Sequence, residues 1–429
     1  MFGFANFLLL ALFAAAVFDL IFALARGGGL RGALHGLWNT PHLLFGQQLA
    51  EWRLQLGRIL FAAGLAAYEI SVVFCNSMAR QNWAWVQGVM SPVLEWLAFL
   101  CFGAKILFGT RYTWRELLAG GALYFIARWV YFNSQNIWWI GIVVAVLAAK
   151  DVPLRRPLQV YFASGCAAMA VVLALHFAGI VAPDLTSERM GALRGTYGYG
   201  HPNTFGGLVF GLVLAYALLR AQKVRWVDCL LVFAVGVFLL VGPASRSAAL
   251  CTLALAVGLV FCRLRAGYSV PRWWPGTCAG MVGLTAAVSY LLPLLVIKVG
   301  PWNNDIGPAW LAKLDSLLTC RISLTWMAYR LLDVKIAGQV FNWPTVDNSF
   351  AFALFQFGPV VAALLGILFA AALWGHAKQG RRVEVCCLFA MLAYAYMEVQ
   401  PFHLTTNPTA LLLCGAVFAQ TSARWQKIE

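Results

Sequence analysis

Charged residues are scarce in this sequence. Only 11% of the 429 residues are Asp, Glu, Lys or Arg, against about 25% in a soluble domain. Hydrophobic residues make up 62% of the chain, and the mean hydropathy is +0.77. A soluble fold cannot cover that much apolar surface. Ten-residue segments of alternating polarity, the mark of a membrane β-barrel, are also absent from the sequence. The composition therefore predicts a bundle of helices in a bilayer.

Motifs that hold metals or nucleotides are missing too. The eleven cysteines have no zinc or redox spacing, and the only close pair is the adjacent Cys386 and Cys387, so we interpret them as small apolar fillers. The chain has no phosphate-binding loop of the nucleotide type, no metal-binding aspartate pair and no nucleophile elbow in its expected cytoplasmic segments. We therefore expect no nucleotide-driven activity and no cofactor. The net charge of +15 is dispersed over short loops, so we expect no nucleic-acid partner.

Apolar runs long enough to cross about 30 Å of hydrocarbon recur along the whole chain. They predict an all-α, polytopic transmembrane helical bundle that forms one membrane domain over residues 1–429. The first run lacks a basic region and a cleavage site, so we expect it to remain as a helix. The thirteen predicted spans lie near residues 3–25, 58–78, 86–108, 115–132, 136–149, 157–181, 203–221, 226–243, 247–262, 276–297, 350–374, 383–397 and 407–421.

Basic residues concentrate in alternate loops between these spans, for example Arg155 with Arg156 and Arg381 with Arg382. The positive-inside rule then predicts cytoplasmic positions for these loops and for the C-terminus, with the N-terminus outside. Two long loops, 182–202 and 298–348, fall on the extracytoplasmic side. Apolar residues at helical spacing in the second loop, broken near Thr319 and Cys320, predict two short helices on the outer membrane face.

The first of these loops ends in a glycine-rich motif with basic residues. Gly198 and Gly200 allow backbone amides to approach a ligand, Arg194 can fork onto phosphate oxygens, and His201 and Asn203 flank the start of the next helix. An anionic head group would fit this motif. The structural alternative is an ordinary glycine-rich turn in which His201 caps the helix.

Three further outer segments carry polar groups. Arg246 lies in a tight hairpin, where a lone arginine is often an interface anchor. Arg321 lies in the long loop, and Asp347 and Asn348 precede a span, so that Asp347 is either a helix cap or a general base. Glu398 belongs to the last such segment, and its structural alternative is pairing with one of the outer arginines.

Asn407 completes this last segment, which also contains His403. Together the outer segments predict a cationic pocket with one or two carboxylates at the level of the lipid head groups. A lipid diphosphate suits that composition.

The order of these motifs resembles the O-antigen and capsular polysaccharide polymerase (Wzy) and O-antigen ligase superfamily. The resemblance covers about residues 95–415 and rests on the following pieces: Arg194 to Asn203, Ser-Arg-Ser at Arg246, Leu-Asp-Ser-Leu-Leu-Thr-Cys-Arg-Ile-Ser-Leu around Arg321, Ala-Gly-Gln at Gly338, Val-Asp-Asn-Ser-Phe with Gly358, and Glu398 with Asn407 and Pro408.

This resemblance implies a membrane-embedded glycosyltransferase of the GT-C type in the cell inner membrane that needs no metal. It implies transfer of an undecaprenyl-diphosphate-linked oligosaccharide to a sugar hydroxyl of a second lipid-linked repeat unit, with inversion, and a chain-length regulator as a possible partner beside membrane lipids. In the ligases the position matching Asp347 is a histidine, so the aspartate looks like the capsule-type polymerases.

Transfer from a prenyl diphosphate requires stabilisation of the leaving group and a proton acceptor for the attacking hydroxyl. We expect Arg194 and Arg321 to stabilise the diphosphate, with Arg246 in support, and Asp347 to accept the proton. Glu398 and His201 are the reserve proton acceptors. We expect substrate contacts from Gly198, Gly200, Asn203, Asn348 and Asn407, and sugar stacking on Tyr197, Tyr199, Trp302 and Trp310.

Two other functions remain open from the sequence. A ligase would use the same pocket to transfer glycan to another lipid or protein acceptor. A lipid-linked oligosaccharide flippase would place charges or broken helices near the bilayer midplane, often in two repeated halves. Here the polar motifs gather at the outer ends of spans and no repeat is visible, which favours an enzyme over a transporter or a scaffold.

Overall fold

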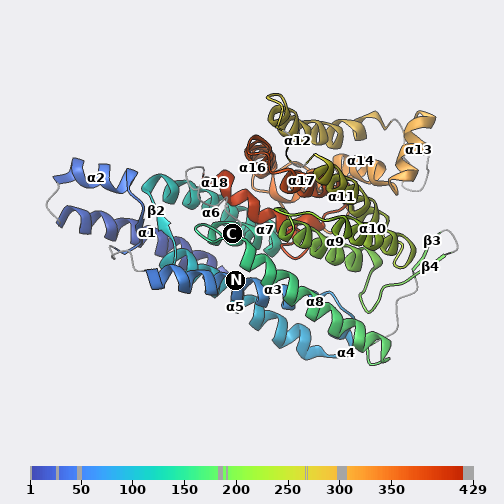
Figure 1. Cartoon of the computed structure of the whole chain (residues 1–429), viewed down its shortest axis with the longest axis horizontal. Coiled ribbons are helices and arrows are strands. Elements are labelled where there is room, and N and C mark those ends of the chain that lie inside the picture. The colour runs from blue at the N-terminus through green and yellow to red at the C-terminus, as the bar shows by residue number, and fades with distance from the viewer. Residues whose placement is uncertain are drawn as a thin grey trace. The chain divides into compact units, whose positions relative to one another are not determined.

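A computed structural model describes residues 2–25, 29–45, 51–181, 187–189, 192–265, 267, 269–296 and 307–418 (Figure 1). In these residues, eight helices are long and apolar enough to cross a membrane, and three shorter apolar helices accompany them. The prediction of an all-α, multi-pass membrane protein is confirmed at this level. The eight are Gly3–Ala25, Glu51–Cys75, Val86–Phe108, Arg155–Phe177, Pro202–Leu219, Arg246–Leu264, Trp274–Leu295 and Pro359–Lys378.

The chain divides into two compact units. The first unit comprises Met1–Arg128, Trp139–Leu208 and Ala410–Glu429. Its elements are α1 (Phe2–Ala25), α2 (Gly29–Asn39), β1 (His42–Leu43), α3 (Glu51–Cys75), α4 (Ala79–Asn82), the π-helix Val86–Met90, α5 (Ser91–Phe108), β2 (Arg111–Tyr112), α8 (Arg155–Phe177), β3 (Ser187–Arg189), β4 (Ala192–Arg194) and α18 (Cys414–Val417), with most of α6 (Trp114–Ser134) and α7 (Ile137–Ala148) and the start of α9 (Pro202–Leu219).

Close helix packing forms the core of the first unit. Gly57 of α3 lies so near Gly109 that an added Cβ would meet the Gly109 carbonyl oxygen at 2.8 Å. Further along α3, Gly64 makes room for Phe102 of α5, whose ring also packs against Phe61 with centroids 5.7 Å apart. Small residues at these positions allow the backbones to approach, as in other membrane helix pairs.

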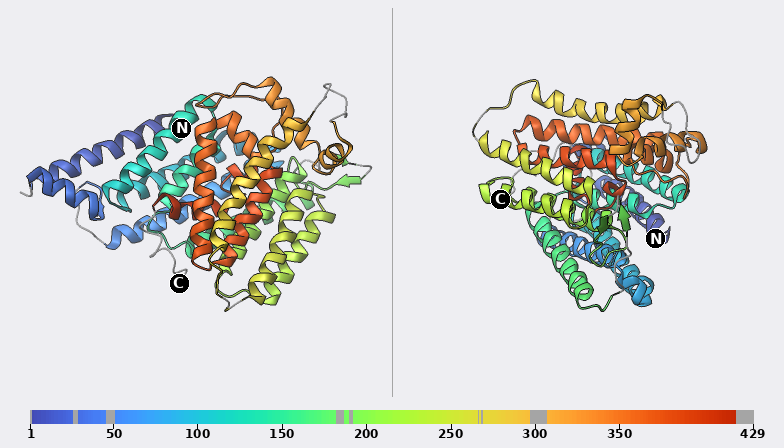
Figure 2. Two further views of the ribbon diagram at one scale, coloured as in Figure 1. Left: turned by 90° about the horizontal axis from the view of Figure 1, so that it is seen from above. Right: turned by 90° about the vertical axis from the view of Figure 1, so that its right-hand side faces the viewer.

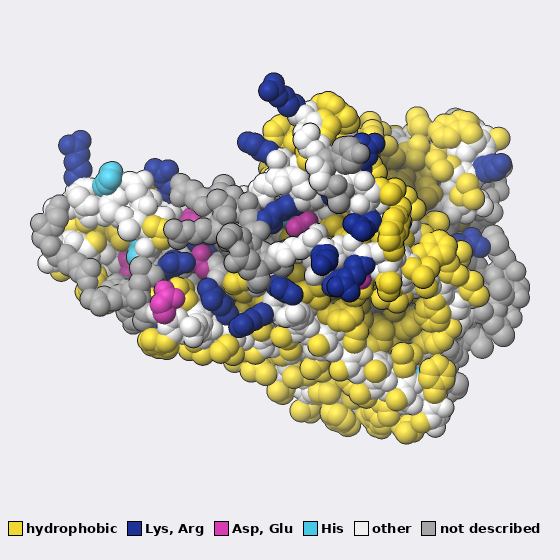
Figure 3. All heavy atoms as spheres, viewed as in Figure 1, with side chains coloured by type: hydrophobic (Ala, Val, Ile, Leu, Met, Phe, Trp, Pro, Cys, Tyr) yellow, Lys and Arg dark blue, Asp and Glu magenta, His cyan; other side chains and the backbone are white. Residues whose placement is uncertain are grey.

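The outer surface of this unit is apolar. Side chains such as Ile59 of α3, Leu100 of α5 and Phe177 of α8 are more than half exposed. Figure 3 shows hydrophobic side chains over the face formed by α3, α5 and α8. Because the hydrocarbon core of a bilayer is the natural solvent for such a surface, these helices are suited to contact lipid.

The second unit comprises Trp129–Trp138 and Val209–Thr409. Figure 2 shows α10 and α11 as neighbouring helices in it. Its elements, besides the ends of α6, α7 and α9, are α10 (Trp226–Val241), α11 (Arg246–Leu264), α12 (Trp274–Leu291), the 3-10 turn Leu292–Leu295, α13 (Ala309–Leu317), α14 (Arg321–Leu331), α15 (Ser349–Phe352), the π-helix Ala353–Phe357, α16 (Pro359–Lys378), α17 (Arg382–Met397) and the 3-10 turn Gln400–Phe402.

Thirteen spans were predicted, whereas the described residues contain eight helices of spanning length, and two of the predicted spans differ in detail. The segment expected as a single span at 350–374 is divided at Gly358, where φ is +87° and ψ is 165°. This conformation ends the π-helix Ala353–Phe357, and α16 begins at Pro359 with proline in its first turn. The last predicted span, 407–421, begins as a 3-10 helix, Pro408–Leu413, followed by α18; its residues after 418 lie outside the described part.

The long segment 298–348 contains α13 and α14, and its residues up to 306, Trp302 among them, lie outside the described part. Thr319 and Cys320 separate the two helices, both with φ of 63°. Leu311 and Ile322 form a small apolar cluster with Val296, which follows the 3-10 turn Leu292–Leu295. The left-handed turn thus redirects the chain while both helices keep apolar contacts.

Candidate functional site

Arg321 is the centre of a buried ion-pair network in the second unit. It begins α14 and is only 8% exposed. Its Nη2 atom lies 2.6 Å from Glu398 Oε1 and 3.3 Å from Ser247 Oγ, and its Nη1 donates to the Leu318 carbonyl oxygen at 3.0 Å. The ion pair expected as the structural alternative for Glu398 is therefore present.

A second carboxylate faces the same guanidinium group. Asp347 Oδ2 lies 3.9 Å from Arg321 Nε. The Asp347 side chain is 32% exposed, whereas that of Glu398 is 6% exposed. Arg321 is thus shared between one buried and one accessible carboxylate. Of these two carboxylates, only Asp347 is accessible to a molecule that approaches the surface of the protein.

Asp315 fixes the turn that presents Arg321. Its Oδ1 accepts hydrogen bonds from the amides of Ile322 and Ser323 at 2.8 and 3.2 Å, and its Oδ2 accepts one from Ser323 Oγ at 2.8 Å. The carboxylate thereby satisfies two of the amides at the start of α14 and complements the positive end of the helix. This role of Asp315 was not predicted, although the residue belongs to the Leu-Asp-Ser-Leu-Leu-Thr-Cys-Arg stretch.

Asn348 fixes the backbone beside Asp347. Its Oδ1 accepts from the amides of Phe350 and Ala351 at 2.9 and 3.1 Å, so Asn348, not Asp347, is the N-cap of α15. Its Nδ2 donates to Ser289 Oγ of α12 and to the Tyr396 carbonyl of α17, at 3.1 and 3.2 Å. The capping alternative considered for Asp347 thus applies one residue later.

Ser349 adds another link between this turn and the end of α17, because its Oγ donates to the Glu398 carbonyl at 2.5 Å. The backbone on the C-terminal side of Asp347 is therefore tied to the residue that pairs with Arg321. Preorganisation of this kind holds a reacting group in place without reorganisation during a reaction.

Arg246 lies beside the network. It is the exposed first residue of α11, and its neighbour Ser247 accepts the hydrogen bond from Arg321. The N-terminal end of a helix carries partial positive charge, which adds to that of the guanidinium group. This position therefore offers an exposed positive group next in sequence to Ser247, which contacts Arg321.

The Asn407 side chain is buried and hydrogen-bonded within the protein. The residue is 3% exposed, its Nδ2 donates to the Pro401 carbonyl at 3.0 Å, and its Oδ1 accepts from Thr409 Oγ1 at 2.5 Å. These contacts hold the segment that follows α17. Because this side chain is buried, the structure does not support the direct substrate contact that the sequence predicted.

His403 was part of this segment in the sequence but had no assigned role. Its ring lies against that of Trp138, with centroids 3.7 Å apart and planes at 42°. Burial lowers the pKa of His403 to about 3, because the charged imidazolium is poorly solvated there. The ring is therefore neutral near pH 7 and acts as a packing group.

Acidification is expected to weaken the fold through His403. An unfolded histidine has a pKa of about 6.5, so between pH 6.5 and about 3 the unfolded chain binds a proton that the folded chain excludes. The free energy of unfolding should fall as the pH is lowered through this window. In detergent, the drop in stability from pH 7 to pH 5 should be smaller in His403→Gln than in wild type. The exposed His35→Gln is the control, and an unchanged drop in His403→Gln would contradict this assignment.

The glycine-rich motif lies in the first unit. Arg194 is buried, and its Nη2 donates to Asn203 Oδ1 at 3.0 Å. His201 Nδ1 accepts the amide hydrogen of Asn203 at 3.1 Å, close to the start of α9. Gly198 has φ of +82°, and an added Cβ would meet His176 Cβ at 3.0 Å, whereas Gly200 has open space around it. The capping alternative for His201 agrees with this geometry.

Two of the proposed sugar-stacking residues are packed within the protein. Tyr199 is fully buried, and both Tyr197 and Tyr199 lie against Phe205, with ring centroids 5.0 and 5.6 Å away. Trp310 of α13 is 55% exposed. The tryptophan is therefore the better placed of these three for contact with a ligand or with lipid.

The predicted site residues thus fall into two sets. Arg321, Asp347, Asn348 and Glu398 form one connected network in the second unit with Arg246 beside it, and Asn407 lies in the same unit. The following belong to the first unit: Arg194, Gly198, Gly200, His201 and Asn203. In the described part of the chain, no group of three His, Cys, Asp or Glu side chains is arranged to hold a metal ion. No protein-family model, curated protein or solved structure matches the chain.

Proposed function

We propose that this chain is a polysaccharide polymerase of the cytoplasmic membrane. It would transfer an undecaprenyl-diphosphate-linked glycan to a sugar hydroxyl of another lipid-linked repeat unit. The observation that carries the proposal is the network in which Arg321 joins the buried Glu398 to the accessible Asp347. The motif order that resembles the polymerase superfamily includes all three residues.

In this proposal Asp347 accepts the proton of the acceptor hydroxyl. The hydroxyl oxygen forms a bond to the anomeric carbon of the donor, and the bond from that carbon to the diphosphate oxygen breaks. The diphosphate leaves with the bonding electron pair, and direct attack inverts the anomeric centre. Asp347 suits this role because it is the exposed carboxylate and its backbone is held by Asn348 and Ser349.

Arg321 is proposed as the positioning residue for Asp347, since its guanidinium group is already engaged by two carboxylates. The exposed Arg246 at the start of α11 is proposed to receive the diphosphate, where the helix end adds to its positive charge. The outer side of the membrane is the proposed location of the site, with the N-terminus outside and the C-terminus in the cytoplasm, because basic loops alternate along the sequence.

The test is an in vitro reaction of the purified full chain in detergent with the cognate undecaprenyl-diphosphate repeat unit and a metal chelator. Wild type is expected to make a ladder of lengthened lipid-linked glycans. Asp347→Asn should reduce the rate by about 10²–10⁴-fold, the usual contribution of a general base. Asp333→Asn, an exposed carboxylate after α14, is the matched control and should retain activity.

The alternatives give different results in this assay. A ligase would make one transfer to another acceptor and no ladder, and a flippase would move the lipid between leaflets without changing it. Absence of a ladder from verified cognate substrate would overturn the polymerase proposal, and full activity of Asp347→Asn would overturn the assignment of the base.

A further inference from the structure

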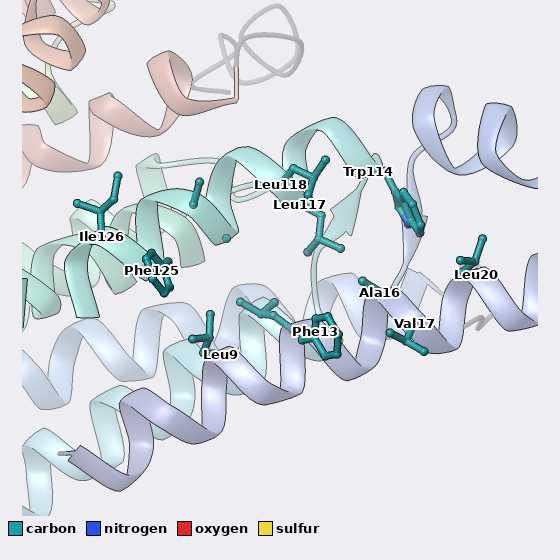
Figure 4. A pocket seen from close by; sticks show the side chains of 13 residues that line it. Leu9, Phe13, Ala16, Val17, Leu20, Trp114, Leu117, Leu118, Phe125 and Ile126 are labelled. Atoms are coloured by element: carbon teal, nitrogen blue, oxygen red, sulfur yellow. The ribbon is translucent and has the colours of Figure 1, made fainter. Parts of the chain in front are cut away.

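An apolar groove lies between α1 and α6 in the first unit (Figure 4). It has a volume of about 710 Å³. In Figure 4, Leu117 and Phe125 of α6 point toward α1, and Leu9 points toward α6. Apart from the indole nitrogen of Trp114, the side chains that line the groove are hydrocarbon.

The groove follows from how the two helices are joined. Near the start of α1, the Tyr124 hydroxyl donates to the Ala5 carbonyl at 3.0 Å, and Arg128 Nε donates to Asn6 Oδ1 at 2.8 Å. Further along, small residues of α6 leave the space unfilled. An added Cβ at Gly121 would meet no atom within 4 Å.

The acyl chain of a lipid is the natural occupant of this groove. α1 is one of the candidate spans, and its Phe7, Leu10 and Phe13 are each more than 60% exposed. Water would find no hydrogen-bonding partners among hydrocarbon side chains, whereas an acyl chain would recover the packing contacts that the empty groove lacks.

A positive charge directly follows Trp114, the lining residue at one end of the groove. Arg115 is exposed, its guanidinium carbon lies 5.3 Å from the centre of the Trp38 ring, and its Nη2 donates to Asn39 Oδ1 at 3.2 Å. Among the described residues, no carboxylate lies within ion-pair distance of Arg115. The neighbouring Glu116 is already paired with Lys150 at 3.3 Å.

The short helix α2, which Arg115 contacts, has the composition of a helix that lies at the level of the lipid head groups. Its exposed Leu30, Leu34 and Trp38 recur every fourth residue and form one apolar face, while Ala33 and Leu37 are buried. A short amphipathic helix with a tryptophan on its exposed face is typical of the membrane interface. Because Arg115 stacks on Trp38, its guanidinium group lies at the same level.

We propose that this groove binds one acyl chain of an anionic phospholipid, whose phosphate contacts Arg115. The hydrocarbon lining would pack against the acyl chain, and the guanidinium group of Arg115 would attract the negatively charged head group. A neutral phospholipid would fill the groove equally well but would gain less from Arg115. This site does not depend on the function proposed above, since none of its residues belongs to the Arg321 network.

Native mass spectrometry of the delipidated full chain in neutral detergent tests the site, by titration with phosphatidylglycerol or phosphatidylcholine of identical acyl chains. Gly121→Leu fills the groove and should remove the tightest phosphatidylglycerol site. Gly283→Leu, on the exposed face of α12 with open space around it, is the matched control. Arg115→Gln should weaken phosphatidylglycerol binding about fivefold and leave phosphatidylcholine binding unchanged, while the exposed Arg156→Gln should change neither.

Three results would overturn the proposal. The first is wild-type affinity for phosphatidylglycerol in Gly121→Leu, which would place the lipid elsewhere. The second is equal affinity of wild type for the two phospholipids. The third is displacement of phosphatidylglycerol by undecaprenyl phosphate at equal concentration, which would assign the groove to an isoprenoid chain. Because Arg115 is exposed, Arg115→Gln keeps the test valid even if Gly121→Leu fails to fold.

Discussion

Arg321→Ala is expected to abolish the proposed glycan transfer and to lower the free energy of unfolding by about 3–5 kcal/mol, the usual cost of removing one partner of a buried ion pair. The physical reason is the burial of the Glu398 side chain, which is 6% exposed and would keep its charge without a partner. Asp347 would lose the group that orients it, and a misplacement of about 1 Å can cost about 100-fold in rate.

The stability loss and the activity loss must be separated. Arg321→Met combined with Glu398→Gln leaves no unpaired charge at the buried position, so we expect it to regain most of the free energy of unfolding. The same double variant should remain inactive, because Asp347 still lacks its proposed positioning residue. Measurements of unfolding in detergent and of the glycan ladder on the same preparations give both values.

Arg330→Ala is the control for this experiment. Arg330 is exposed near the end of the same helix, and its guanidinium carbon lies 5.6 Å from the centre of the Trp326 ring. Its replacement should change the free energy of unfolding by about 1 kcal/mol at most. Recovery of both stability and glycan transfer in the double variant would show that the ion pair only supports the fold, and the role proposed for Arg321 would be wrong.

The helices were predictable from the sequence because their signal is local. The mainly apolar runs predicted as spans at 3–25 and 247–262 both adopt helices, Phe2–Ala25 and Arg246–Leu264. The division at Gly358 was not predicted, since the run on either side of it is equally apolar. A glycine within an apolar run fits a helix as well as a break, and only its contacts with distant residues decide between them.

The candidate site was predictable in part. Motif order and side of the membrane led to Arg321, Asp347, Asn348 and Glu398, which the structure connects. The sequence could not show that Asn348 caps the helix and leaves Asp347 accessible, because either side chain can cap a helix. The choice depends on contacts with Ser289 and Tyr396, which are far away in the sequence. Asp315 was missed for a related reason, since an aspartate in an amphipathic segment is usually a solvated residue.

Gly338 and Gly358 lie where two backbone segments make close contact. Both occur in the motifs that resemble the polymerase superfamily, but the sequence offered no reason for them. In the structure a Cβ on Gly338 would lie 2.0 Å from the Gln356 carbonyl oxygen, and a Cβ on Gly358 would lie 2.1 Å from the Ile336 carbonyl oxygen. The two backbones therefore touch at the base of the loop that carries Asp347.

Gly338→Ala and Gly358→Ala are each expected to destabilise the protein by about 3 kcal/mol or more and to stop the proposed glycan transfer. Both glycines have positive φ, +73° and +87°, and the conformation of Gly358 is essentially restricted to glycine. The added methyl group would also force apart two backbones that cannot shift as a flexible side chain can. Because this contact closes the loop on both sides of Asp347, its loss should displace the proposed base as well.

Gly366→Ala in α16 is the matched control, since an added Cβ there meets nothing within 4 Å and the backbone is helical. That change should stabilise the protein by about 0.5–1 kcal/mol through helix propensity. Thermal unfolding in detergent, followed by the glycan ladder assay, measures all three variants. Wild-type unfolding temperatures for Gly338→Ala and Gly358→Ala would mean that the loop closes without this contact, and Asp347 would then need another explanation for its position.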